Sequence, residues 1–159
     1  MPMTSFNVIY ILSHLYRHVF TEGIGLRQLI DYYFVLVKSE ERRVKNLTAL
    51  QRELKHLGLW KFAGAVMYVL HETLGLSEEK MIAPMDEKRG KLLLSEILNG
   101  GNFGKHFSKY GHFTQQGMAK KYFLKIWRNM HFVRYYPAEA LSEPIFRTWH
   151  FFWRMKNKK

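Results

Sequence analysis

At 159 residues the chain has the length of one domain, and a content of 47% apolar and 16% aromatic residues is sufficient for a packed core. It contains no cysteine, which excludes a disulfide framework, a zinc–thiolate site and a thiol nucleophile, and a reducing cytoplasm is the simplest compartment for it. The net charge is +12, and residues 105–159 carry +10 of it, with 12 Lys or Arg against two Glu. That third of the chain indicates an anionic partner (nucleic acid, a nucleotide phosphate, an acidic membrane or an acidic protein surface), unless it is only a basic solvated surface.

The N-terminal stretch has neither the features of a secretory signal nor those of a membrane span. No basic residues precede its apolar stretch, as they would in a signal peptide. His14, Arg17 and His18 interrupt that stretch before it reaches the length that a bilayer requires. We therefore expect no transmembrane segment.

Helical periodicity dominates the sequence, and no segment alternates as a β-strand does. The first helix is predicted to begin at a Thr4 or Ser5 cap and to run to about Phe20, and its almost uniformly apolar surface is typical of a central, buried helix. A glycine-containing turn at 23–25 ends it. A second helix is predicted over 26–38.

Four further helices and a closing one complete the expected fold. An amphipathic helix starting at Leu47 stops at Gly58, and another over 60–74 is closed by Gly75. Asp86 caps a helix that reaches about residue 98. A long helix over 116–136 stops before Pro137, and Pro144 begins the last one. The predicted fold class is all-α, a compact bundle of about six to seven helices in a single domain over residues 1–159.

Polar residues share one stripe of the first helix: Asn7, His14, His18 and Thr21. Two histidines four positions apart can share a metal ion, and Glu22 lies one turn further on. Metalloprotease helices place a Glu directly after the first histidine, where this chain has Leu15. We favour a structural pair bonded to neighbouring helices, with a polar pocket wall and a metal site as the alternatives, and we predict no metal site.

The segment from Gly23 to Asp31 is the main candidate for anion binding. Gly23 and Gly25 let the backbone turn and a ligand approach closely, and the free N–H groups of the following helix favour an anion. Arg27 in that first turn opposes the helix dipole, which is typical of a binding site or of an ion pair. The alternative is a pair between Arg27 and Asp31, four residues later. Gln28 belongs to the same candidate site.

A second glycine-rich run, Gly100-Gly101-Asn102-Phe103-Gly104, precedes Lys105 and His106. Glycines followed by a lysine suggest a phosphate cradle. The spacing is one residue short of the phosphate loop, and His106 stands where that motif needs Ser or Thr. A helix end followed by a basic loop is therefore the preferred interpretation, and we keep Asn102 and Lys105 as candidate anion-binding residues.

Aromatic and basic residues are interleaved between 120 and 136 and again between 149 and 156. Aromatic rings stack on bases while cations hold phosphates, so this pattern fits single-stranded nucleic acid. It also fits an acidic membrane surface. Aromatic residues at helical spacing are more often part of a core, and we favour that interpretation.

The stretch from Tyr10 to Phe20, continuing from Glu22 to Tyr32, resembles the C-terminal part of bacterial nucleotidyltransferase-like proteins. In that family a polymerase-beta-like catalytic domain is followed by a helical region. The glycine-rich run at 100–104 and the Tyr-Pro pair at 136–137 resemble the same region. The resemblance implies that five residues line the cleft that faces the nucleotide or its acceptor: His14, His18, Arg27, Gln28 and Asp31.

The family's catalytic domain is expected to supply a Gly-Ser turn and metal-binding carboxylates, and this sequence has neither. The resemblance therefore implies a helical part that is not catalytic alone and has a catalytic nucleotidyltransferase domain as its partner, in cis or in trans. No cofactor is expected in this chain, and Mg²⁺ would enter only with a nucleotide on that domain. Whether the protein is an enzyme stays open. The alternatives are a basic nucleic-acid-binding module and a non-catalytic protein-interaction domain.

Overall fold

The structure, a computed structural model, describes residues 3–21, 23–38, 47–100 and 132–137 and five single positions in the second half of the chain: Met130, Ile145, Thr148, Trp149 and Trp153. This described part contains five α-helices, one 3-10 turn and no β-strand. None of its helices is long and apolar enough to cross a lipid bilayer. The chain divides into two compact units, 1–107 and 108–159, and each is described by itself. A single domain over 1–159 stays a prediction.

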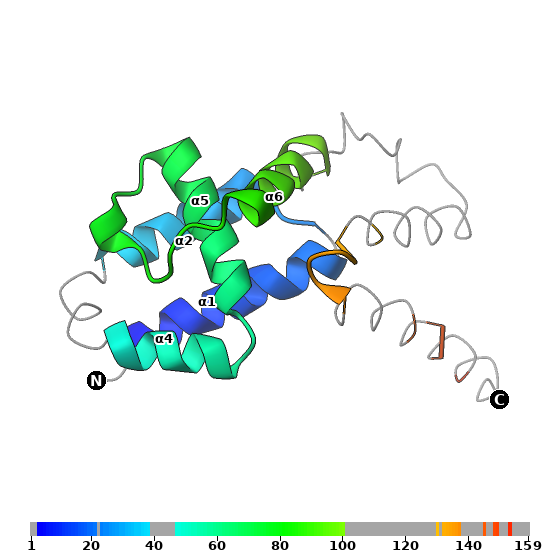
Figure 1. The fold of residues 1–159 in the computed structure, drawn as a ribbon, viewed down its shortest axis with the longest axis horizontal. Helices are drawn as coiled ribbons and strands as arrows, with labels where there is room; N and C mark the ends of the chain where they lie inside the picture. The colour runs from blue at the N-terminus through cyan, green and yellow to red at the C-terminus, as the bar shows by residue number, and fades with distance from the viewer. Residues whose placement is uncertain are drawn as a thin grey trace. The chain divides into compact units, whose positions relative to one another are not determined.

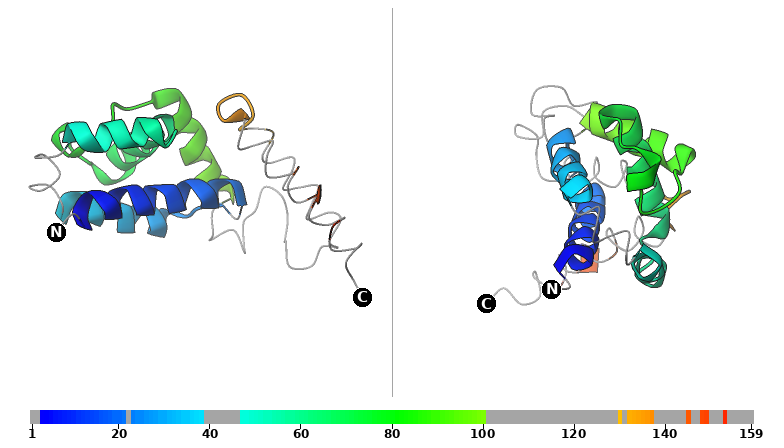
Figure 2. Two further views of the ribbon diagram at one scale, coloured as in Figure 1. Left: turned by 90° about the horizontal axis from the view of Figure 1, so that it is seen from below. Right: turned by 90° about the vertical axis from the view of Figure 1, so that its left-hand side faces the viewer.

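Helices α1 (Met3–Thr21) and α2 (Leu26–Lys38) form an antiparallel hairpin and pack side by side (Figures 1 and 2). Each contributes a row of apolar side chains, at three- and four-residue spacing, that is at most 1% exposed: Val8, Leu12, Leu15 and Val19 from α1, and Leu29, Tyr32 and Leu36 from α2. Helix α4 (Leu47–His56) adds Leu50 and Leu54 to the same core. The predicted bounds of these three helices are confirmed to within one or two residues.

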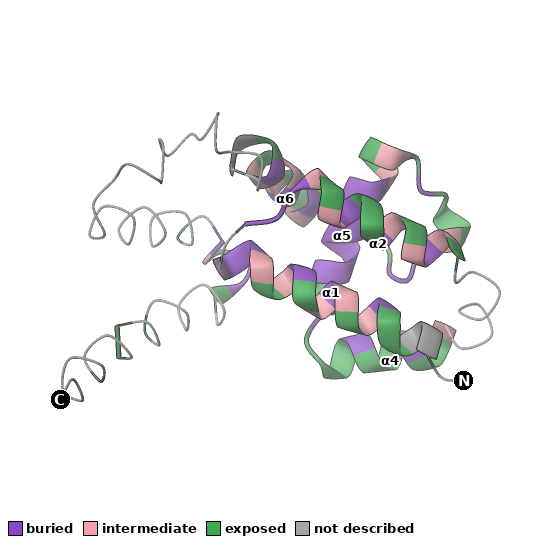
Figure 3. Ribbon diagram, turned by 180° about the vertical axis from the view of Figure 1, so that it is seen from behind, coloured by how far each residue is buried: buried purple, intermediate pink, exposed green. Residues whose placement is uncertain are grey.

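The most deeply buried helix is α5 (Trp60–Leu74), which contacts α2, α4 and α6. Its buried residues run almost without interruption from Phe62 to Leu70, and Figure 3 shows it behind α1 and α2 with a largely buried surface. The expectation that the first helix is the central buried one is therefore wrong. Helix α1 buries one face only and leaves Phe6 and Tyr10 65% and 58% exposed, because no other described helix covers its second apolar row.

Helix α6 (Glu87–Gly100) follows a 3-10 turn, η1 (Glu78–Lys80), and packs closely against α5. Glycine makes this approach feasible, since a Cβ atom on Gly90 would lie 2.3–2.6 Å from atoms of the Tyr68 side chain. On α5, a Cβ atom on Gly64 would lie 2.7 Å from the carbonyl oxygen of Pro84. The Gly64 carbonyl accepts a hydrogen bond of 3.1 Å from the N–H of Asp86. Two glycines thus set the distance between α5, α6 and their connection.

The predicted C-terminal end of α5 and the predicted start of α6 are confirmed. Gly75 closes α5 in the left-handed conformation, with φ at 66°, and its N–H bonds to the carbonyl of His71. Asp86 caps α6, because its Oδ1 accepts a bond of 3.0 Å from the N–H of Arg89. Local sequence signals therefore set both ends.

In the second unit, Met130 is helical and residues 132–135 form a turn. The N–H groups of Tyr135 and Tyr136 both donate to the Phe132 carbonyl, at 2.9 and 2.7 Å. The helix predicted over 116–136 therefore does not continue to Tyr136, which agrees with the bias of a residue before proline against helical angles. The rest of that prediction lies outside the described residues. Ile145, Thr148, Trp149 and Trp153 are helical, as expected for the last helix.

Candidate functional site

The α1–α2 corner is the name used here for the connected ends of the two helices, with the residues His14, His18, Gly23, Gly25, Arg27, Gln28 and Asp31. Gly23 and Gly25 are buried in it. The chain reverses direction between α1 and α2, and the N–H of Gly23, with φ at 86°, donates to the carbonyl of His18 at 2.7 Å. This short connection brings the last two turns of α1 next to the first two turns of α2. The predicted site residues that the structure describes therefore all lie at the end of the hairpin where α1 is joined to α2.

Two histidine rings contact each other on α1. The Nε2 atoms of His14 and His18 lie 2.9 Å apart and form a hydrogen bond, and the ring planes are nearly perpendicular, with centroids 4.3 Å apart. His14 is exposed and His18 is half-buried. The interpretation as a pair bonded to neighbouring helices is wrong for His14, whose ring bonds to its own helix.

The histidine pair ends a row of four rings along the outer face of α1. Phe6 stacks on Tyr10 with centroids 5.8 Å apart, and Tyr10 stacks on His14 at 6.4 Å. The sequence analysis missed this row, although the four-residue spacing from Phe6 to His18 would have revealed it. Aromatic rings and imidazoles thus form one continuous exposed strip.

The N-terminus of α2 is partly closed by its own side chain. The Oε1 atom of Gln28 accepts a bond of 2.9 Å from the N–H of Gly25, and the N–H of Gln28 donates to the Gly25 carbonyl at 3.2 Å. This is the glutamine half of a capping box. Gln28 therefore occupies one of the backbone donors that an anion at this helix end would use.

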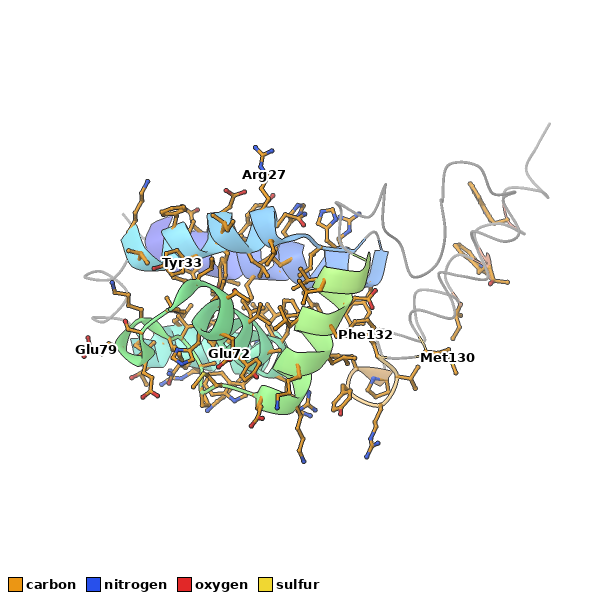
Figure 4. All side chains as sticks on the ribbon, turned by 90° about the horizontal axis from the view of Figure 1, so that it is seen from above. Arg27, Tyr33, Glu72, Glu79, Met130 and Phe132 are labelled. Atoms are coloured by element: carbon orange, nitrogen blue, oxygen red, sulfur yellow. The ribbon has the colours of Figure 1, made fainter. Side chains whose placement is uncertain are left out.

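Arg27 points away from the neighbouring helices into solvent (Figure 4). Asp31 is also exposed, and these two described side chains form no ion pair with each other. The alternative in which Arg27 and Asp31 satisfy each other between packed helices is therefore wrong. The guanidinium remains accessible to a ligand.

Several predicted site residues cannot be placed. Asn102 and Lys105 lie outside the described residues, as do Glu22 and the side chain of Thr21. The glycine-rich run begins at Gly100, the last described residue of α6, and its other residues lie outside the described part of the chain, so the interpretation as a helix end stays a prediction.

A second feature is an open hollow of about 440 Å³ beside the start of α6. Its walls come from the first turn of α5 and the connection before α6: Trp60, Lys61, Gly64, Pro84, Met85, Asp86, Glu87 and Lys88. Lys55 lies 4.7 Å above the Trp60 ring. The sequence analysis predicted only the Asp86 cap here, because the hollow depends on the close approach at Gly64.

The Asp86 carboxylate dominates the electrostatics of this hollow. Partial burial opposes its ionisation, but the Arg89 N–H and the Arg89 guanidinium, 2.7 Å away, outweigh burial and lower the pKa of Asp86 below its ordinary value of 3.8. Exposed Glu87 adds a further negative charge and is paired with Lys91 at 2.6 Å. Each carboxylate of the lining is thus paired with a cation, and Lys61 and Lys88 add two positive charges to the walls of the hollow.

In the second unit, large apolar side chains face solvent at four-residue spacing. Ile145, Trp149 and Trp153 are 67%, 58% and 50% exposed. The interpretation of the C-terminal aromatic residues as core is therefore wrong for Trp149 and Trp153, whereas Phe132 and Tyr136 are buried.

Among the described residues, no three His, Cys, Asp or Glu side chains gather closely enough to hold a metal ion together. Chemically, the α1–α2 corner offers a guanidinium, two imidazoles and exposed rings, which suit charge and hydrogen-bond contacts. Comparison with protein-family models, with curated proteins and with solved structures found no match.

Proposed function

We propose that this chain is a helical, non-catalytic part of a nucleotidyltransferase system, and that its α1–α2 corner forms one wall of the site for the nucleotide or its acceptor. The proposal starts from the resemblance of residues 10–32 to that family. The observation that carries it is the position of Arg27, which is exposed, is not paired with Asp31 and lies in the same corner as the histidine pair. The five residues that the resemblance implies for the cleft all lie on the connected ends of α1 and α2, which supports the proposal.

The chemistry of the corner suits binding. A guanidinium presents a rigid fork of N–H donors that matches phosphate oxygens, and exposed imidazoles add further donors. The described residues of the corner include no pair of carboxylates that would hold Mg²⁺. The catalytic groups and Mg²⁺ would therefore belong to a separate domain, in cis or in trans, while the corner positions the ligand.

The surface around the corner supports the idea of a partner domain. On α1 the exposed residues Phe6 and Tyr10 precede the histidines, and on α2 Ile30 and Phe34 are 38% and 51% exposed. Clustered apolar side chains on a surface commonly mark a site of protein contact. A catalytic domain seated on this face would cover them and place its own site at the corner.

The test is nucleotide binding by the chain alone and by the chain mixed with a candidate catalytic domain. We expect Mg-bound nucleoside triphosphate to raise the melting temperature, and Arg27→Gln to weaken binding at least about tenfold, a loss typical of a charge-assisted phosphate contact. Lys38→Gln is the matched control, because Lys38 is an exposed cation at the far end of α2. If no nucleotide shifts either sample, or both variants lose affinity equally, the proposal is wrong.

A second candidate function is a basic nucleic-acid-binding module. The exposure of Trp149 and Trp153, in a unit whose residues 109–159 are rich in Lys and Arg, favours it, because exposed rings stack on bases. Binding of a single-stranded oligonucleotide should weaken steeply with salt, since neutralised phosphates release counterions. Trp149→Ala should weaken it further, and an affinity that does not change with salt would exclude this function.

A further inference from the structure

Contrary to the prediction made from the sequence alone, we infer that His14 and His18 form a chelating site for a divalent late transition-metal ion, with water completing its coordination. Imidazole nitrogens bind such ions at about 2.0–2.1 Å, so two cis ligands at right angles lie about 2.8–3.0 Å apart. The two Nε2 atoms are 2.9 Å apart. Tetrahedral ligands at the same bond length would lie about 3.3–3.4 Å apart. The hydrogen bond between the rings thus holds the two nitrogens at a separation that is also compatible with cis positions on an octahedral or tetragonal ion such as Ni²⁺ or Cu²⁺.

The helix holds the pair in position before any metal arrives. Both histidines lie on one face of α1, one turn apart, and the adjacent residues Leu15 and Val19 are 1% exposed in the core. The Tyr10 ring stacks on His14 from the other side. Little freedom is lost on chelation, which favours binding. Because His14 is exposed, hydrated ions can reach the pair.

Metal binding requires a change of tautomer. In the hydrogen-bonded pair, one ring carries a proton on Nε2 and the other offers a lone pair. Coordination needs a lone pair on both Nε2 atoms, so the donor ring loses its Nε2 proton to solvent and gains one on Nδ1. Both rings stay neutral, and two metal–nitrogen bonds replace the hydrogen bond. The stability order of these ions predicts tighter binding of Cu²⁺ than of Ni²⁺.

This inference goes beyond the proposed function and does not depend on it. The metal ion would bind the two imidazoles alone, whereas Arg27 is the main phosphate contact of the proposed nucleotide site. Arg27→Gln should therefore leave the affinity for Ni²⁺ unchanged while it weakens nucleotide binding. Failure of one proposal is thus distinguishable from failure of the other.

The experiment is calorimetric titration of the full chain with NiCl₂. His14→Ala and His18→Ala should each weaken binding at least tenfold, because either substitution turns a chelate into a single ligand. His56→Ala removes an exposed histidine at the end of α4 and should leave the affinity unchanged. Circular dichroism and the melting temperature of each variant show whether it is folded.

Two rearranged variants test the spacing. Ser13→His combined with His14→Ala keeps the number of histidines but places them five apart, on different faces of α1, and should bind as weakly as His14→Ala. Tyr10→His combined with His18→Ala restores a four-residue spacing one turn earlier, at an exposed position, and should recover the affinity. Folded His14→Ala and His18→Ala variants that bind Ni²⁺ as well as the unchanged chain would overturn the inference, and so would full affinity in the five-residue arrangement.

Discussion

The helix pairs α5–α6 and α1–α2 differ in how far their side chains are buried. Helix α5 is buried over most of its length, and Gly90 of α6 fits directly against Tyr68 of α5. The outer faces of α1 and α2 instead present rings and charged groups to solvent, among them Tyr10, Phe34 and Arg27. The first pair is therefore packed closely along its contact, whereas each helix of the second pair buries one face and exposes the other.

The contrast is consistent with the function proposed for the α1–α2 corner. Burial of apolar side chains supplies most of the folding free energy of a small domain. Because α5 and α6 provide much of this burial, the outer faces of α1 and α2 can carry residues that do not contribute to stability. Sites that break local rules tend to be functional. Arg27 at the start of a helix and the row of rings on α1 break such rules without a packing reason, whereas Gly64 in α5 and Gly90 in α6 are explained by close packing.

The largest expected effect compares two phenylalanines. Phe62→Ala on α5 should lower the free energy of unfolding by about 3–5 kcal/mol, because Phe62 is 2% exposed and packs on Tyr16 with ring centroids 4.9 Å apart. Phe34→Ala on α2, at 51% exposure, should change it by no more than about 0.5 kcal/mol. Urea unfolding measures both. Similar losses in the two variants would remove the distinction between the helix pairs.

A smaller effect is expected at the glycine between α5 and α6. An alanine in an open helical position is favoured over glycine by about 1 kcal/mol. At Gly90 the new Cβ would lie 2.6 Å from the Cβ of Tyr68, which cannot swing away as a side-chain tip can. Gly90→Ala should therefore destabilise by about 1–3 kcal/mol, with exposed Lys88→Ala as the neutral control on the same helix. A stabilised Gly90→Ala variant would show that the helices are not in close contact.

The smallest effects compare the two helix N-termini. Asp86→Ala should lower the free energy of unfolding by about 1 kcal/mol at pH 7, because Asp86 caps α6. Gln28→Ala should lower it by about 0.5–1 kcal/mol, because one neutral hydrogen bond is lost. Because folding lowers the pKa of Asp86, its contribution is full above pH 3.8 and disappears as the pH falls through the lower folded-state value. Gln28 does not titrate. Unfolding curves measured over a range of pH should therefore show that the destabilisation by Asp86→Ala decreases in acid, whereas the destabilisation by Gln28→Ala does not change.

Much of the first unit could be predicted because its signals are local. The bounds of α2 and α5 were predicted to the residue, and Gly75 and Asp86 act as expected, because capping depends on neighbouring residues alone. The candidate corner was also largely predictable, since Gly23, Gly25 and Arg27 lie within five positions of each other. What could not be predicted was the accessibility of Arg27, because Asp31 was an equally good local partner.

By itself the sequence determined that the described part of this protein is helical and where most of its described helices begin and end. Hydrogen bonds between near neighbours and the period of the apolar residues are enough for that. Only the tertiary structure decided that α5 and not α1 is the most deeply buried helix. It also decided that Gly90 lies directly against the Tyr68 side chain and that the rings of Phe6 and Tyr10 on α1 are exposed. Those outcomes depend on which apolar faces find partners, and α1 carries two such faces while the described helices cover one.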